Sequence, residues 1–162
     1  MKYFYKIDDG KLIRGSGTKI PDSFTEYSKD NPPEDFLEIY NQELLESTKD
    51  TKKKELVGVF NEILGNGYTC SNGIKLDAPL EDINNLQGDY DYEFVSGGTS
   101  MVVRDYNNVN QEIPLEDVAD MLLELRENYN NNLKTLWYYK DLISNSTDIE
   151  EVTKITWEDI NE

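Results

Sequence analysis

The chain opens with alternating extended and helical patterns. Residues 3–7 and 11–14 are rich in β-forming side chains, and the Asp9-Gly10 pair between them predicts a hairpin, followed by a glycine-rich break at residues 15–17. After two prolines, residues 34–46 place Phe36, Tyr40 and Leu44 at helical spacing. The lysine-rich residues 47–54 predict a hinge, either a solvated linker or the first turns of a second helix, which is expected over residues 52–64.

The period changes again in the second half. Residues 68–76 predict another hairpin around an Asn72-Gly73 turn, and residues 78–86 predict a short helix. Residues 90–94 alternate aromatic and acidic side chains, which predicts a strand ending at two glycines. Residues 100–105 and 110–113 predict two further strands, and residues 114–144 carry a long amphipathic stripe that could be interrupted at residues 130–132.

These elements predict an α+β fold. Short antiparallel strands and hairpins are expected to pack on the long C-terminal amphipathic helix, with a β-hairpin and a helix at the N-terminus. We expect residues 1–50 to form this hairpin-and-helix leader and residues 51–162 to form an acidic α+β domain. Trp137 and Trp157 lie on apolar stripes and are expected to belong to the core.

Charge adds a strong asymmetry to this picture. Of the 33 acidic residues, 20 follow Leu76 with only five Lys or Arg, so this half holds 15 of the 17 net negative charges. Such a surface repels nucleic acid and anionic membranes, since binding to them depends on Lys and Arg. We therefore expect a protein partner, with no direct contact to nucleic acid or membrane.

The residue types disfavour an enzyme. The chain has no histidine, which excludes Ser/His/Asp and Cys/His catalysis and removes the commonest general base. The single Cys70 precedes an Asn-Gly turn and has no basic neighbour in sequence, so it is expected to be a structural thiol. We expect no catalytic residues, no cofactor and no metal.

Several charged residues are candidates for partner binding. Asp89, Asp91 and Glu93 would share one face of a strand, where they could hold a cation such as Ca²⁺, although a solvated face is the favoured interpretation. Arg104 is one of only three arginines, and with Asp105 it is expected to close the following turn by hydrogen bonds, with a contact role as the alternative. The acids of the long helix form the remaining candidate surface, which is either only solvated or a docking face: Glu116, Asp117, Asp120, Glu124 and Glu127.

Five short motifs, read in order, carry a resemblance. They are Gly67-Tyr68, the run Asn72-Gly73-Ile74-Lys75-Leu76-Asp77-Ala78, the run Arg104-Asp105-Tyr106-Asn107-Asn108, the helix opening Ile113-Pro114-Leu115-Glu116-Asp117-Val118, and Trp137-x-x-Lys140-x-x-Ile143. Over about residues 52–157 the chain resembles a domain of unknown function found in phage and prophage tail fibre and tail-associated proteins. That family has no assigned catalytic residues.

The resemblance implies a non-enzymatic phage or prophage protein of the tail or tail fibre that works through protein contacts. Its partners would be phage tail components, and its location the host bacterial cytoplasm during infection or the virion tail. The charge supports an alternative, a small acidic phage-encoded inhibitor such as an anti-CRISPR, which would mimic nucleic acid and block the basic channel of a host nucleic-acid-binding protein. The sequence leaves the oligomeric state open.

Overall fold

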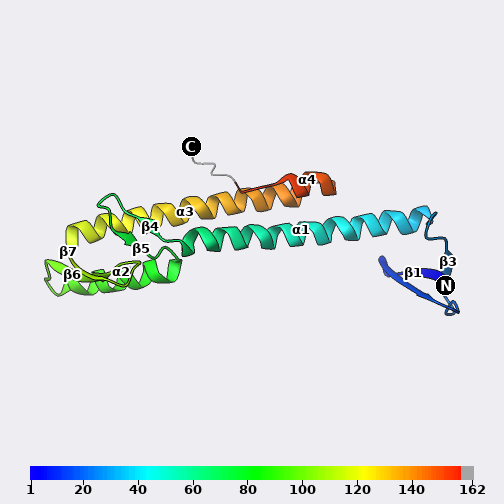
Figure 1. Cartoon of the computed structure of the whole chain (residues 1–162), viewed down its shortest axis with the longest axis horizontal. Helices are drawn as coiled ribbons and strands as arrows, with labels where there is room; N and C mark the ends of the chain where they lie inside the picture. Colours follow the sequence, from blue (N-terminus) through cyan, green and yellow to red (C-terminus); the bar gives the residue numbers. More distant parts are fainter. Residues whose placement is uncertain (158–162) are drawn as a thin grey trace. The chain divides into compact units, whose positions relative to one another are not determined.

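Residues 1–157 are described by a computed structural model with four helices and seven short strands (Figure 1). The predicted α+β class is confirmed. The chain divides into two compact units, of which the first comprises Met1–Lys52 and Ser146–Lys154. The second comprises Lys53–Asn145 and the residues that follow from Ile155.

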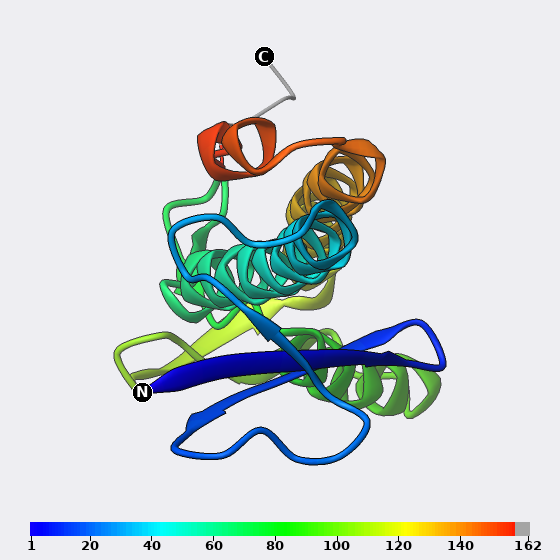
Figure 2. The same cartoon turned by 90° about the vertical axis from the view of Figure 1, so that its right-hand side faces the viewer.

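The first unit contains a three-stranded antiparallel sheet (Figure 2). Strands β1 (Lys2–Asp8), β2 (Lys11–Gly17) and β3 (Thr25–Tyr27) lie in the order β2-β1-β3. Asp9 and Gly10 have φ of 51° and 73°, as a two-residue type I′ turn requires, so the predicted hairpin is confirmed. The predicted break at residues 15–17 is wrong, because β2 continues through these glycines. The ring of Phe4 lies over Gly15, where a Cβ atom would come within 2.7 Å of it.

Aromatic rings join this sheet to helix α1 (Glu34–Gly65). The buried ring of Phe36 lies 5.3 Å from that of Tyr5 and 4.7 Å from that of Tyr27 between centroids. The Tyr5 hydroxyl donates a hydrogen bond to the Asp35 carboxylate at 3.0 Å, and burial together with this carboxylate raises the pKa of Tyr5. Edge-to-face packing and a satisfied hydroxyl thus fix the start of the helix against the sheet.

The predicted hinge at residues 47–54 is also wrong, because α1 runs through these residues without a break. They are helical, as the alternative interpretation had it, but they belong to one long helix. Thr48 and Thr51 donate their hydroxyl hydrogen bonds back to the carbonyls of Leu44 and Ser47, so these side chains do not compete with the helix. Lysine is a good helix former, and a lysine-rich stretch therefore continues a helix as readily as it forms a linker. The first unit ends with α4 (Ile149–Lys154), whose first turn is capped by the Asp148 side chain.

The second unit places two β-hairpins and a helix around one end of a long helix (Figure 1). The predicted hairpins are confirmed, although the first is shorter than expected. The elements are β4 (Tyr68–Thr69), β5 (Lys75–Leu76), α2 (Leu80–Val95), β6 (Ser100–Arg104), β7 (Asn110–Pro114) and α3 (Leu115–Asn145). Helix α3 is continuous, without an interruption at residues 130–132.

The strand predicted over residues 90–94 is wrong, since these residues belong to α2. Ile83, Leu86 and Tyr90 recur at helical spacing and turn inwards, with Ile83 fully buried, whereas the alternating aromatics Tyr92 and Phe94 are 71% and 64% exposed. The helix ends in a Schellman motif around positive-φ Gly97: the amide of Gly98 donates to the carbonyl of Glu93, and that of Gly97 to the carbonyl of Phe94.

The core of the second unit lies between the apolar stripe of α3, one face of the β6–β7 hairpin, and α2. Met101 and Ile113 are paired across the hairpin and both are buried, while Val102 points outwards. The stripe predicted on α3 is confirmed at Leu136 and Tyr139 as well as in its first three turns. Its buried members there are Leu115, Val118, Met121, Leu122 and Leu125.

The end of α1 is locked to both hairpins at Gly67. This residue has a φ of +71°, and a Cβ atom there would lie 2.7 Å from the Leu76 carbonyl oxygen and 2.7 Å from the Tyr106 ring. Gly58, inside α1, has open space where a Cβ atom would lie. The two glycines therefore differ in what an added methyl group would meet.

We expect Gly67→Ala to lower the free energy of unfolding by about 2–4 kcal/mol, because it combines left-handed backbone strain with a backbone clash. Gly58→Ala is the matched control and should raise it by about 0.5–1 kcal/mol. Urea unfolding followed by circular dichroism measures both. Equal stability of Gly67→Ala and the unaltered protein would contradict this account of the junction.

Candidate partner-binding site

A pocket of about 290 Å³ opens on the second unit. It lies where the segment after β5, helix α2, strand β6 and the β6–β7 turn come together. Four aspartates and four aliphatic residues form its wall, together with one arginine and one asparagine. The lining residues are Leu76, Asp77, Asp82, Leu86, Asp89, Val102, Val103, Arg104, Asp105 and Asn108.

Helix α2 supplies two of the four carboxylates. Asp82 and Asp89 are seven residues apart, about two helical turns, so both face the pocket. Asp91 lies about 160° around the helix from Asp89 and does not line the pocket. The predicted common face of Asp89, Asp91 and Glu93 is therefore wrong: in a helix Glu93 stays near the side of Asp89, and Asp91 points away.

Asp77 follows strand β5 and lies beside α2. Its pKa is raised, first by desolvation of the carboxyl group and second by the negative charge of Asp82, while Lys75 acts in the opposite direction. Like charges in a confined place favour protonation of one of them or the arrival of a cation. The pocket thus gains favourable electrostatic energy when a positive group enters it.

Asp105 is held differently, as the centre of the β6–β7 turn. Its Oδ1 accepts hydrogen bonds from the amides of Asn107 and Val109, both at 2.9 Å, and its Oδ2 accepts one from Gln111 Nε2 at 2.8 Å. The pKa of Asp105 is lowered chiefly by the Val109 amide, with Gln111 and Asn107 adding to the effect. This carboxylate therefore stays charged at the rim of the pocket.

Arg104 does not close the turn, which corrects the sequence prediction. Within residues 1–157 its guanidinium makes no hydrogen bond or ion pair, and it is an exposed side chain at the pocket. The short Asp105 side chain reaches the turn amides directly, so the long arginine is not needed there. Arg104 is thus left available for a partner's acidic group.

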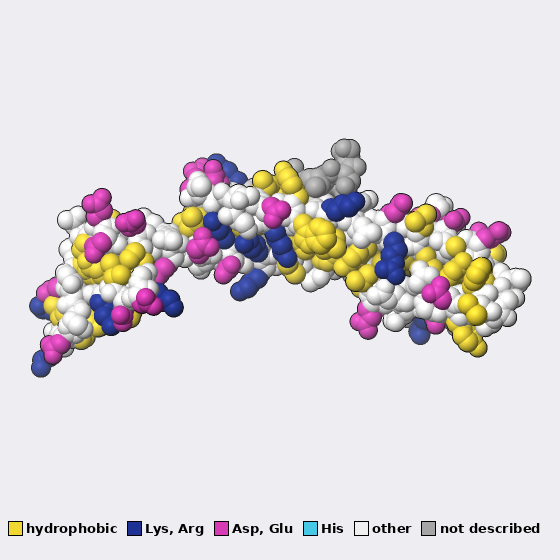
Figure 3. All heavy atoms as spheres, turned by 180° about the vertical axis from the view of Figure 1, so that it is seen from behind, with side chains coloured by type: hydrophobic (Ala, Val, Ile, Leu, Met, Phe, Trp, Pro, Cys, Tyr) yellow, Lys and Arg dark blue, Asp and Glu magenta, His cyan; other side chains and the backbone are white. Residues whose placement is uncertain are grey.

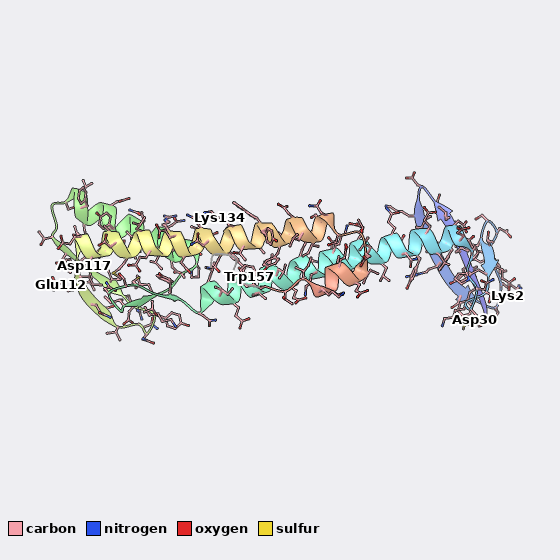
Figure 4. All side chains as sticks on the ribbon, turned by 90° about the horizontal axis from the view of Figure 1, so that it is seen from above. Lys2, Asp30, Glu112, Asp117, Lys134 and Trp157 are labelled. Carbon is pink, nitrogen blue, oxygen red and sulfur yellow. The ribbon has the colours of Figure 1, made fainter. Side chains whose placement is uncertain are left out.

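The five predicted acids of α3 do share one face. Their positions fall within an arc of about 100° on the side away from the core. Figure 4 labels Asp117 in the first turn, close to Glu112 of β7, and Lys134 farther along the helix beyond the acidic stretch. Glu124 has a structural role, because its carboxylate accepts hydrogen bonds from the amide and hydroxyl of Ser71. This face is separate from the pocket.

Sequence reasoning identified Asp89 and Arg104 but missed the three other charged groups of the pocket. Asp82 could have been found from its spacing to Asp89, had residues 90–94 been assigned to the helix that starts before them. Asp77 and Asp105 come from two other segments, and only the fold brings them together.

The chemistry of the pocket suits binding of a positive group. Among the described residues, no group of three or more Cys, Asp or Glu is arranged to hold a metal ion.

Cys70 is buried, and burial together with the charge of Glu124 raises the pKa of its thiol to about 11. A thiol with this pKa is protonated at neutral pH and a poor nucleophile, as the sequence predicted.

Apolar side chains are exposed on the same unit. Tyr92, Phe94 and Val95 protrude from the end of α2, and Val102 from the outer face of β6. Figure 3 shows hydrophobic and acidic side chains intermixed on this unit, at the right of the view. Trp137 is 56% exposed, so its predicted place in the core is wrong, whereas the half-buried Trp157 packs against Phe60 and Tyr139 as expected.

Comparisons with known proteins give no relative: no protein family, no curated protein and no solved structure matches the chain. None of the helices within residues 1–157 has the length and apolar character that a membrane crossing requires.

We expect Asp105→Asn to destabilise the protein at pH 7, because an amide replaces the charge that accepts three hydrogen bonds. The folded-state pKa of Asp105 is depressed, so its contribution is complete above the unfolded-state pKa of about 3.9 and is lost as pH falls below it. Thermal unfolding should show a difference in melting temperature between the two proteins. We expect this difference to be constant from pH 7 to about pH 5 and to become smaller below about pH 4.

The neighbouring Arg104→Ala is the control for this experiment. Its exposed guanidinium has no partner within the described part of the chain, so the change should alter the free energy of unfolding by less than about 0.5 kcal/mol. A larger loss for Arg104→Ala than for Asp105→Asn would restore Arg104 as the residue that closes the turn.

Proposed function

We propose that this chain is a non-enzymatic phage or prophage protein, associated with the tail or tail fibre, that works by binding a basic surface of another protein. The five sequence motifs that resemble tail-associated domains support the phage context. They include Tyr68, Asp105 and Trp137, which belong to the second unit.

The observation that carries the binding role is the pocket with four carboxylates around it. The charge of Asp82 adds to desolvation in raising the pKa of Asp77, and Asp105 is kept ionised by its hydrogen bonds. A Lys or Arg side chain of a partner would relieve this repulsion. The exposed Tyr92 and Phe94 nearby on α2 offer the aromatic area that protein interfaces favour.

Purified virions of the source phage test the context. Mass spectrometry should detect the protein in them, and a tagged copy should retain tail components from an infected-cell lysate. The double variant Asp82→Asn/Asp89→Asn should weaken that retention about tenfold, about 1.4 kcal/mol. Asp91→Asn removes the same kind of charge from the opposite side of α2 and should leave retention unchanged. Absence from virions together with no captured tail component would refute the tail role.

A second candidate function is inhibition of a host nucleic-acid-binding protein. It is supported by the α3 face, where Glu116, Asp120, Glu124 and Glu127 form a row of negative charges about 4.5–6 Å apart along the helix axis. Such a row could occupy a basic channel in place of a nucleic-acid strand.

Capture from uninfected host lysate separates this alternative from the tail role. An inhibitor should retain a host nucleoprotein complex, and that retention should fall steeply between about 50 mM and 200 mM salt, since it rests on screened charges. The change Glu116→Gln/Asp120→Asn should abolish retention, while Glu112→Gln on β7 serves as the control. Capture that does not vary with salt would rule out a nucleic-acid mimic.

A further inference from the structure

The outer edge of strand β2 offers a second, unrelated binding surface, in the first unit. Strand β2 pairs only with β1, so one of its edges carries no strand within residues 1–157. Asp8 and Lys11 flank the two-residue turn and form a hydrogen-bonded pair of β1 and β2. Every second residue pair along the two strands from there is also hydrogen-bonded. The amides and carbonyls of Leu12, Arg14 and Ser16 therefore point to the open edge.

The protein itself shows that this edge accepts acidic groups. The amide of Leu12 donates a hydrogen bond to a carboxylate oxygen of Glu43 on α1, at 3.1 Å. Glu43 thus closes the edge at the end nearest the turn. Among residues 1–157 no strand lies opposite the amides of Arg14 and Ser16, and these two positions form the open stretch.

A pocket of about 280 Å³ lies beside this open stretch, between β2 and α1. The guanidinium of Arg14 lies 4.5 Å from the centre of the Tyr40 ring, which holds it in place by a cation–π contact. It makes no ion pair within the described residues. Added strands draw affinity from main-chain hydrogen bonds and specificity from pockets for alternate side chains. The lining residues are Arg14, Tyr40, Glu43, Leu44 and Ser47.

Charge selects the occupant. Residues 11–19 contain Lys11, Arg14 and Lys19 and no acidic residue, in a chain whose net charge is −17. A second copy pairing through the same strand would bring two basic strands together, whose like charges repel. An acidic strand would instead complement them.

We propose that the open edge of β2 binds an extended acidic segment of a protein partner as an added β-strand. One side chain of the segment enters the pocket beside Leu44, and a carboxylate of the segment pairs with Arg14. This surface involves none of the residues of the acidic pocket, so the inference goes beyond the function proposed above.

A synthetic seven-residue peptide of alternating Glu and Val, capped at both ends, is a suitable probe. We expect it to bind the full chain with a Kd of about 1 mM or lower, and the matching Lys/Val peptide not to bind. In ¹⁵N-resolved NMR spectra the amides of Arg14 and Ser16 should shift most, since they gain hydrogen bonds. The amides of Ile13 and Gly15 already pair with β1 and serve as internal controls.

Three variants sharpen the test. Arg14→Ala should weaken binding about tenfold or more by removing the ionic contact. Ser16→Pro removes one outward amide while leaving the pairing with β1 intact, and should abolish binding. Ile13→Thr changes a side chain on the opposite face of the strand and should bind like the unaltered protein.

No binding of the Glu/Val peptide at about 1 mM, equal binding of the Lys/Val peptide, or shifts that avoid Arg14 and Ser16 would each overturn the proposal. A dimer in sedimentation velocity that Ser16→Pro dissociates would also overturn it, because a second copy would then occupy the edge. If Ser16→Pro loses the native NMR spectrum, the test rests on comparing the peptide affinity of Arg14→Ala with that of Ile13→Thr.

Discussion

The close approach of backbone to backbone at Gly67 is the constraint on which the second unit depends. Only a residue without Cβ allows the chain to pass within contact of the Leu76 carbonyl and the Tyr106 ring. Tyr106 then joins three segments, since its amide donates to the Lys75 carbonyl at 2.9 Å, its hydroxyl to the Gly65 carbonyl at 3.2 Å, and its ring accepts the Lys75 ammonium at 3.9 Å. The end of α1, the β4–β5 hairpin and the β6–β7 turn meet at this point.

This junction also positions the acidic pocket. Asp105 precedes Tyr106, and Asp77 follows Leu76 by one residue, so the same backbone contacts bring two carboxylates from distant segments together. The two pKa values are shifted in opposite directions. Hydrogen-bond donors around Asp105 lower its pKa, whereas desolvation and a neighbouring charge raise that of Asp77. A folded scaffold can therefore hold close negative charges where an unfolded acidic chain would separate them.

The sequence predicted the local features whose cause is local. Asp9-Gly10 and Asn72-Gly73 specify tight turns, and the stripe on α3 has a clear helical period. The alternation of aromatic and acidic residues at Tyr90, Tyr92 and Phe94 led to a wrong prediction of a strand. Such alternation indicates a strand only if one face is buried, and here tertiary packing of Ile83 and Tyr90 selects a helix. Of the five charged residues of the pocket, two were predicted from the sequence, Asp89 and Arg104. Asp77 and Asp105 reach it through Gly67 and Tyr106, a contact over long sequence separation that no local pattern records.

The two proposed surfaces differ in the physics of their binding. The acidic pocket relies on charge at a site open to water, so salt should screen much of its affinity. The edge of β2 adds main-chain hydrogen bonds, which persist when charges are screened, and its basic side chains select the partner more than they hold it. Under the two proposals a net charge of −17 does not restrict the chain to basic partners, because the run from Lys11 to Lys19 contains no acid. In both proposals the choice of partner depends on where the charges lie along each element, which the net charge of the chain does not show.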